Sequence, residues 1–149
     1  MEPVLLQYHP AVGYNDALGM DFDQAAGDKG SFPVPFKCSV YRAQMPVTEN
    51  SAGDTTTAIV KFDKRPAAGS DTNRGDGDIA NIACGTTAAG KVLYDNAARG
   101  TVLYPGEEVV VELAQAATGT TKTGHGHPQL LVVPIPEMEA NLSAMTETA

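Results

Sequence analysis

The sequence predicts an all-β fold, an antiparallel β-sandwich or jelly roll, because its apolar residues recur with a period of two. This period is strongest at 55–63 and 107–113, where β-branched residues are frequent and turn residues lie nearby. The residues expected to face the core are Ala58, Val60, Phe62, Val109, Val111 and Leu113. No stretch shows a comparably strong period of three to four, so the sequence favours strands throughout.

Further short strands are predicted between turns rich in glycine, proline and aspartate. Their spacing of about 8–12 residues is typical of sandwiches and jelly rolls. The nearly continuous apolar run at 130–135 is expected to be buried on both faces, in the core or against another subunit. The predicted strands are 37–44, 55–63, 78–84, 90–95, 101–104, 107–113 and 129–135.

The 149 residues suit a single domain with two appendages. Residues 1–36 are predicted to be an extended N-terminal arm, residues 37–136 the β-sandwich, and residues 137–149 a short polar C-terminal tail. Five of the nine aromatic residues lie in the first 37 positions without a sustained period. These aromatics either seal one end of the sandwich or anchor the arm in pockets of a partner.

Composition narrows the range of partners. The net charge of −8 disfavours direct nucleic-acid binding, which needs basic patches, and it also disfavours anionic membranes. The segment MEPVLLQYHP lacks the basic start and apolar run of a secretory signal, and no window approaches the ~20 apolar residues of a transmembrane helix. We expect a soluble protein made in the cytosol.

The two cysteines, Cys38 and Cys84, each lie in or beside a predicted strand. We expect them to be free and buried, since no dense cysteine framework is present. A disulfide between them stays open as an alternative, because pairing depends on geometry that the sequence does not give.

The sequence Gly124-His125-Gly126-His127-Pro128 is the first candidate for chemistry. Two histidines at i and i+2 on a strand would point the same way, but a metal site needs three or four ligands. The glycines and the proline indicate an exposed turn, so we expect no metal there; a metal site and a pH-sensitive contact are the alternatives.

The segment DTNRGDGD at 71–78 resembles the start of a calcium loop, but Ile82 stands where a bidentate glutamate belongs. A tight turn is therefore expected, and a carboxylate-bound ion is the alternative. The tripeptide Arg74-Gly75-Asp76, associated with integrin binding, is too short to indicate that activity.

Four of the ten basic residues lie close together in the sequence, at Lys61, Lys64, Arg65 and Arg74. They form either a solvated loop or a positive docking spot that orients an acidic partner.

No motif predicts an enzyme. The chain lacks a Gly-x-Ser-x-Gly elbow, a P-loop and a dinucleotide fingerprint. Both cysteines are expected to be buried, whereas reactive thiolates lie in partly exposed, electropositive surroundings. We therefore expect no catalytic residue, no bound metal and no cofactor.

The segment SFPVPFKCSVYRA (31–43), the turn KRPAAGSDTNRGDGDI (64–79), and the strands AAGKVLYD and YPGEEVVVEL give the chain a recognisable order. Over about residues 10–115 it resembles the small decoration, or cement, proteins of tailed-bacteriophage heads. The loop at 118–129 and the tail at 137–149 have no counterpart in this resemblance.

The resemblance implies a non-enzymatic virion protein on the capsid exterior, made in the host cytoplasm. Its partners would be the major capsid protein, whose neighbouring subunits it clamps, and copies of itself as a dimer or trimer. The alternative is a β-sandwich that recognises glycans or a host surface and that would carry an exposed aromatic platform. The expected capsid-binding residues are Tyr8, His9, Tyr14, Phe22, Phe32, Lys64, Arg65 and Arg74.

Overall fold

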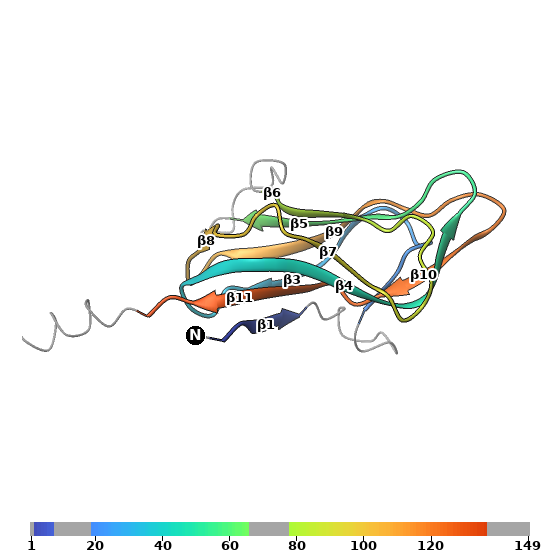
Figure 1. Cartoon of the computed structure of the whole chain (residues 1–149). Coiled ribbons are helices and arrows are strands. Elements are labelled where there is room, and N and C mark those ends of the chain that lie inside the picture. The colour runs from blue at the N-terminus through green and yellow to red at the C-terminus, as the bar shows by residue number, and fades with distance from the viewer. Residues whose placement is uncertain (1, 8–18, 66–77, 137–149) are drawn as a thin grey trace, which may run out of the picture.

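The computed structural model describes residues 2–7, 19–65 and 78–136, and within these ranges the chain forms eleven strands and no helix. The strands assemble into two antiparallel sheets that lie one over the other (Figure 1). The all-β sandwich predicted from the sequence is therefore confirmed. The part of the chain that is described contains no helix long and apolar enough to cross a membrane.

The larger sheet is built around one long strand, β4 (Cys38–Gly53), which pairs with other strands along both of its sides. On one side β4 pairs first with β11 (Gln129–Pro134) and then with β10 (Lys122–Gly126). On its other side it pairs with β7 (Val92–Asp95) and β8 (Val102–Leu103). Two N-terminal strands complete this sheet: β1 (Val4–Gln7) pairs with β11, and β2 (Met20–Asp21) pairs with β10.

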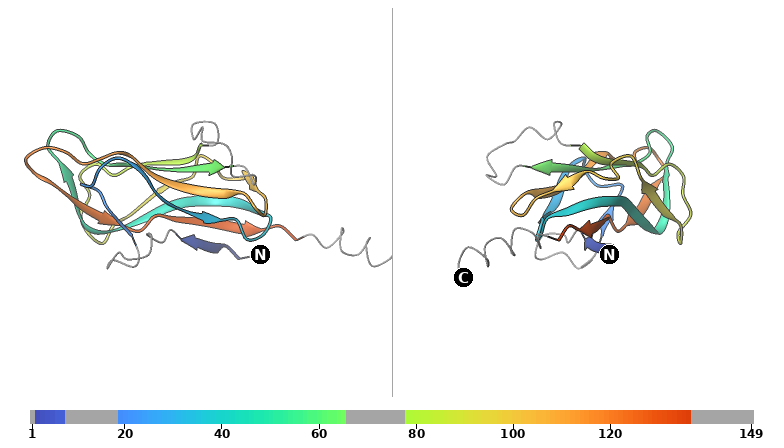
Figure 2. Two further views of the ribbon diagram at one scale, coloured as in Figure 1. Left: turned by 180° about the vertical axis from the view of Figure 1, so that it is seen from behind. Right: turned by 60° about the vertical axis from the view of Figure 1, so that its left-hand side comes forward.

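The smaller sheet has four strands in the order β3-β9-β5-β6, which are β3 (Gly27–Pro33), β9 (Glu108–Gln115), β5 (Ile59–Arg65) and β6 (Asp78–Ala83). The views in Figure 2 show this sheet covering the larger one.

The core lies between the two sheets and contains the residues that the two-residue period predicted. Ala58, Val60, Phe62, Val109, Val111 and Leu113 are all fully buried. The register explains this result, because Phe62 lies opposite Val111 and Val60 lies opposite Leu113 across the β5–β9 pair. Val110 and Asp63, which oppose each other on the outer side of the same pair, are also buried.

All seven predicted strands are present, although β4 continues nine residues beyond the predicted end at 44. For the apolar run at 130–135, burial of both faces in the core of the chain is wrong, whereas burial of one face against another subunit stays a prediction. Leu130 and Val132 are fully buried, but Leu131 and Val133 on the outer face are only half-buried. The run therefore covers the core with one face only, because no second layer of described residues packs on the outside of the larger sheet.

The prediction of an arm over residues 1–36 is wrong for the residues that the structure describes there. β1, β2 and β3 are hydrogen-bonded strands of the two sheets, and Phe22 and Phe32 are buried in the core. The sequence pattern concealed these strands because β1 and β2 are short and because β3 contains two glycines and a bulge between Asp28 and Gly30.

Candidate functional site

Among the expected capsid-binding residues, those that the structure describes do not form one surface site. Phe22 and Phe32 cannot anchor a partner, because both rings are already buried in the core. Tyr8, His9, Tyr14 and Arg74 lie outside the described residues, as do most of the 71–78 turn and the 137–149 tail.

Lys64 and Arg65 are present at the end of β5, but each faces a glutamate of the same molecule. Lys64 Nζ lies 3.4 Å from Glu107 Oε2, and an Arg65 guanidinium nitrogen lies 3.4 Å from Glu108 Oε1. These ion pairs compensate both positive charges within the chain. The docking spot expected here is therefore much less positive than the sequence indicated.

The histidine pair lies on and directly after β10, not in the expected exposed turn. His125 Nδ1 lies 2.8 Å from Asp21 Oδ1 on the neighbouring strand, and the two histidine rings meet edge to face with centroids 5.5 Å apart. Burial lowers the pKa of His127, and the nearby His125 lowers it further. Within the described ranges, no three histidine, cysteine or acidic side chains are grouped so that they could hold a metal ion.

Both cysteines are free and buried, as predicted. Burial raises the pKa of the Cys84 thiol to about 12. The pKa of the Cys38 thiol is also raised, first by burial and then by the negative charge of Glu107. Neither thiol is therefore a ready nucleophile near neutral pH.

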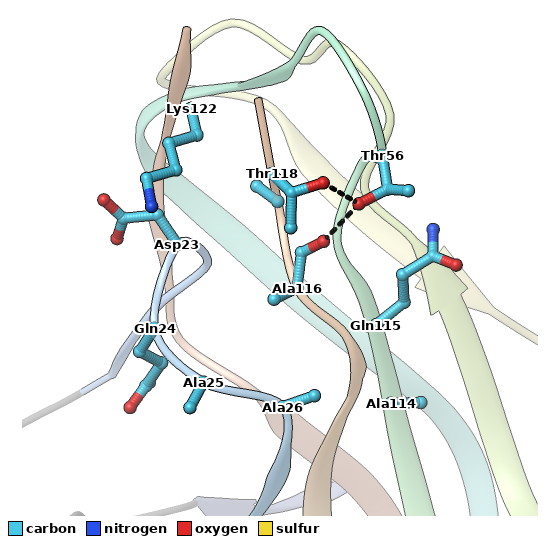
Figure 3. Close-up of a pocket in the computed structure, with 11 residues that line it drawn as sticks. Asp23, Gln24, Ala25, Ala26, Thr56, Ala114, Gln115, Ala116, Thr118 and Lys122 are labelled. Carbon is cyan, nitrogen blue, oxygen red and sulfur yellow. Dashed lines mark hydrogen bonds between the residues drawn. The ribbon is translucent and has the colours of Figure 1, made fainter. Parts of the chain in front are cut away.

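A shallow groove of about 580 Å³ lies where β9 and β10 approach the segment before β3 (Figure 3). Small side chains such as Ala26, Ala114 and Ala116 form much of its lining. Thr56 Oγ1 donates a hydrogen bond to the Ala116 carbonyl at 2.8 Å and lies 2.6 Å from Thr118 Oγ1. The described residues that line the groove include no histidine and no cysteine.

The outer face of the larger sheet carries the most distinctive surface group. Three tyrosines are exposed there: Tyr41 at 36%, Tyr94 at 57% and Tyr104 at 51%. Each ring has a cation over it, at 4.4 Å from the ring centroid for Arg99 over Tyr41, 5.0 Å for Arg42 over Tyr94 and 5.5 Å for Lys37 over Tyr104. We call these six residues the tyrosine–cation face.

The register of β4 determines which of its side chains lie on this outer face. Val40, Ala43 and Met45 of β4 point into the core, so the residues between them point outward. The register of β4 against β11 shifts at Tyr41, where Leu131 opposes Arg42 and Val132 opposes Val40. This bulge gives β4 one extra outward residue, which allows Tyr41 and Arg42 to contact different partners.

Hydrogen bonds hold two of the cations in place. The Gln44 Nε2 group donates to Gln129 Oε1 at 2.7 Å, and Gln44 Oε1 accepts from Arg42 Nε at 3.1 Å. Gln44 also lies directly opposite Tyr94 across the β4–β7 pair. The second cation, Arg99, is held by a hydrogen bond from its Nε to the Tyr41 carbonyl at 2.9 Å. The guanidinium groups are thus pre-organised over the rings.

The strands that carry this face are nearly free of acid, although the protein has a net charge of −8. In β1, β11, β7, β8 and residues 38–46 of β4, the only carboxylate is that of Asp95. Beside these strands, the Glu107 carboxylate accepts a hydrogen bond from the Tyr104 amide at 2.6 Å. The Asp95 carboxylate accepts hydrogen bonds from the amides of Asn81 and Ala97, at 3.0 and 2.8 Å. Lys37, Arg42 and Arg99 form none of the ion pairs found among the described residues.

Sequence reasoning missed this face, although part of the signal was present. The predicted strands 37–44, 90–95 and 101–104 contain Tyr41, Tyr94 and Tyr104, but these rings were not among the residues predicted to bind a partner. The alternation within 37–44 and 90–95 could have shown that Tyr41 and Tyr94 point away from the core. The partnership of each ring with a cation depends on strand pairing, which no local pattern reveals.

No protein-family model matches the chain, and comparisons with curated proteins and with solved structures also found no similar protein.

Proposed function

We propose that this protein is a non-enzymatic structural component of a phage virion that binds the outer surface of the capsid and clamps neighbouring major capsid subunits. The observation that carries the proposal is the tyrosine–cation face: three exposed tyrosines, each with a cation over its ring, where none of the three cations takes part in an ion pair among the described residues. The docking surface is thereby assigned to the larger sheet, in place of the arm and the Lys64–Arg65 region.

The residue types on this face favour a protein partner. Tyrosine and arginine are enriched among the residues that dominate the binding energy of protein interfaces. Tyrosine offers a large contact area with few rotatable bonds, and the stacked guanidinium groups of Arg42 and Arg99 are already ordered by hydrogen bonds. Less conformational entropy is therefore lost when the face is covered.

The charge of the face indicates the chemistry of the partner surface. Lys37, Arg42 and Arg99 can form ion pairs with an acidic patch, while the net charge of −8 makes the acidic surfaces of two copies repel each other. An acidic patch on the capsid would thus orient the protein with its larger sheet toward the shell. We expect this steering to accelerate association and to weaken as salt is added.

Recognition of a glycan is the second candidate, because exposed aromatic rings also bind sugars. The cations distinguish the two possibilities. One side of each ring is occupied by a guanidinium or ammonium group at 4.4–5.5 Å, which leaves less open ring surface for a sugar to stack on. The paired arrangement therefore favours an acidic protein surface.

The test is binding of the purified protein to heads of the encoding phage that lack it, followed by sedimentation and electron microscopy. Arg42→Glu and Tyr94→Ala should each weaken binding at least about tenfold, as expected for central interface residues. Lys122→Glu makes the same charge change as Arg42→Glu at an exposed position on β10 and should bind normally. Equal occupancy of Arg42→Glu and wild type would contradict the proposed docking surface.

A glycan array probed with the same variants distinguishes the second candidate. Binding of the wild-type protein to a sugar, lost in Tyr94→Ala, together with no binding to heads, would replace the capsid proposal with glycan recognition.

A further inference from the structure

The strand β1 forms an outer edge of the larger sheet, beside β11 (Figure 1). Among the described residues, β1 has one neighbouring strand, to which it pairs from Val4 opposite Val132 to Gln7 opposite Gln129. Val4 and Leu5 are exposed at 37% and 44%. No strand within 2–7, 19–65 or 78–136 pairs with the second edge of β1, which lies next to these exposed aliphatic side chains.

Both edges of the smaller sheet carry features that discourage pairing with another chain. On β3 these are Pro33, the charged residues Asp28 and Lys29, and a bulge. On β6 the Asn81 amide already donates a hydrogen bond to the Asp95 carboxylate. Proline, charge, bulges and capped amides are the usual protection of edge strands. The β1 sequence, VLLQ, contains none of these.

Charge favours a second copy of this chain at this edge. Two molecules with a net charge of −8 repel each other wherever acidic surfaces meet. β1 and β11, the two strands nearest this edge, contain no charged residue. The tyrosine–cation face, in contrast, would bring cations together if two copies met there. The edge thus suits self-association, and the face suits an acidic partner.

We infer that two copies pair antiparallel through the outer edges of β1, joining their larger sheets into one continuous sheet across a twofold axis. With the axis perpendicular to the sheet, both outer faces lie on the same side of the dimer, and Val4 and Leu5 are covered by the equivalent strand of the partner subunit. The contact is short, so the dimer dissociates on dilution. Pairing does not depend on the proposed capsid role, but it would present two tyrosine–cation faces to one lattice.

Sedimentation equilibrium of the full-length protein over a range of concentrations tests this inference without any capsid. The wild-type mass should rise from 15.5 kDa toward twice that value. Leu5→Lys places a charge at the edge and should raise the dimer dissociation constant at least about tenfold. Val92→Lys is the matched control, because Val92 is 46% exposed on β7, at the opposite side of the same sheet, and should dimerise like wild type.

A wild-type protein that stays at the monomer mass up to its solubility limit would overturn the inference, as would equal dimerisation of Leu5→Lys and wild type. Circular dichroism and melting of Leu5→Lys show whether the variant is folded. If it is not, hydrogen exchange of the wild-type N-terminal peptide decides: protection that increases with protein concentration supports pairing through β1, and unchanged exchange rules it out.

Discussion

The ring of Phe22 occupies the space that a side chain at Gly124 would need. A Cβ atom added to Gly124 would collide with Phe22 Cδ2, and one added to Gly126 would lie 2.8 Å from Phe22 Cζ. The backbones are also joined, because the Phe22 amide donates to the Gly124 carbonyl at 2.9 Å. The glycines of the GHGHP segment thus allow an aromatic ring from the N-terminal region to lie against β10.

Replacing Gly124 by alanine should therefore destabilise the protein through overpacking as well as backbone strain. Gly27→Ala is the matched control, since Gly27 has nearly the same φ, +135° against +139°, and no atom within 4 Å of an added Cβ. We expect Gly124→Ala to be less stable than Gly27→Ala by about 1–3 kcal/mol in denaturant titrations. If both variants lost the same free energy of unfolding, backbone strain alone would explain the effect at Gly124 and at Gly27.

Phe22→Ala should lower the free energy of unfolding by about 3–5 kcal/mol, because the ring is fully buried. Tyr94→Ala, which removes an exposed ring, should cost less than about 1 kcal/mol. Thermal or chemical unfolding of the two variants measures the difference. If Phe22→Ala left the free energy of unfolding nearly unchanged, the result would support an N-terminal arm that is separate from the core.

Val111→Asp should cost several kcal/mol, because it would bury an unpaired charge opposite Phe62. Glu112→Gln, one position along β9, should be nearly neutral because Glu112 lies on the outer, partly exposed face. Denaturant titration compares the two. Similar stabilities would contradict the register of β9 against β5.

His127 should make the protein less stable in mild acid. Its pKa in the folded protein is lowered from 6.5, so between the folded and unfolded values the unfolded chain binds more protons. The contribution of His127 to the free energy of unfolding is therefore complete at pH values above its pKa in the unfolded chain. This contribution is lost as the pH falls through its lower pKa in the folded protein. Unfolding at about pH 5 and about pH 8 should show a smaller pH dependence for His127→Gln than for wild type. If the stability of His127→Gln and of wild type depended on pH in the same way, His127 would not contribute to the acid sensitivity.

Sequence alone determined the strand class and the inward face of the central strands. Phe62, Val111 and their neighbours follow a period of two, which is local, and the hydrophobic effect then fixes which face is buried. The same local patterns located all seven predicted strands and the two buried cysteines.

Only the tertiary structure decided which residues the surface presents. Phe22 became a core residue because β10, about a hundred positions later, provides glycines at the point where the ring lies. Lys64 and Arg65 lost their uncompensated charge because β9 brings Glu107 and Glu108 beside them. Tyr41 meets Arg99, and Arg42 meets Tyr94, through non-local contacts around β4. Such contacts depend on strand order and register between distant segments, which a local period does not specify.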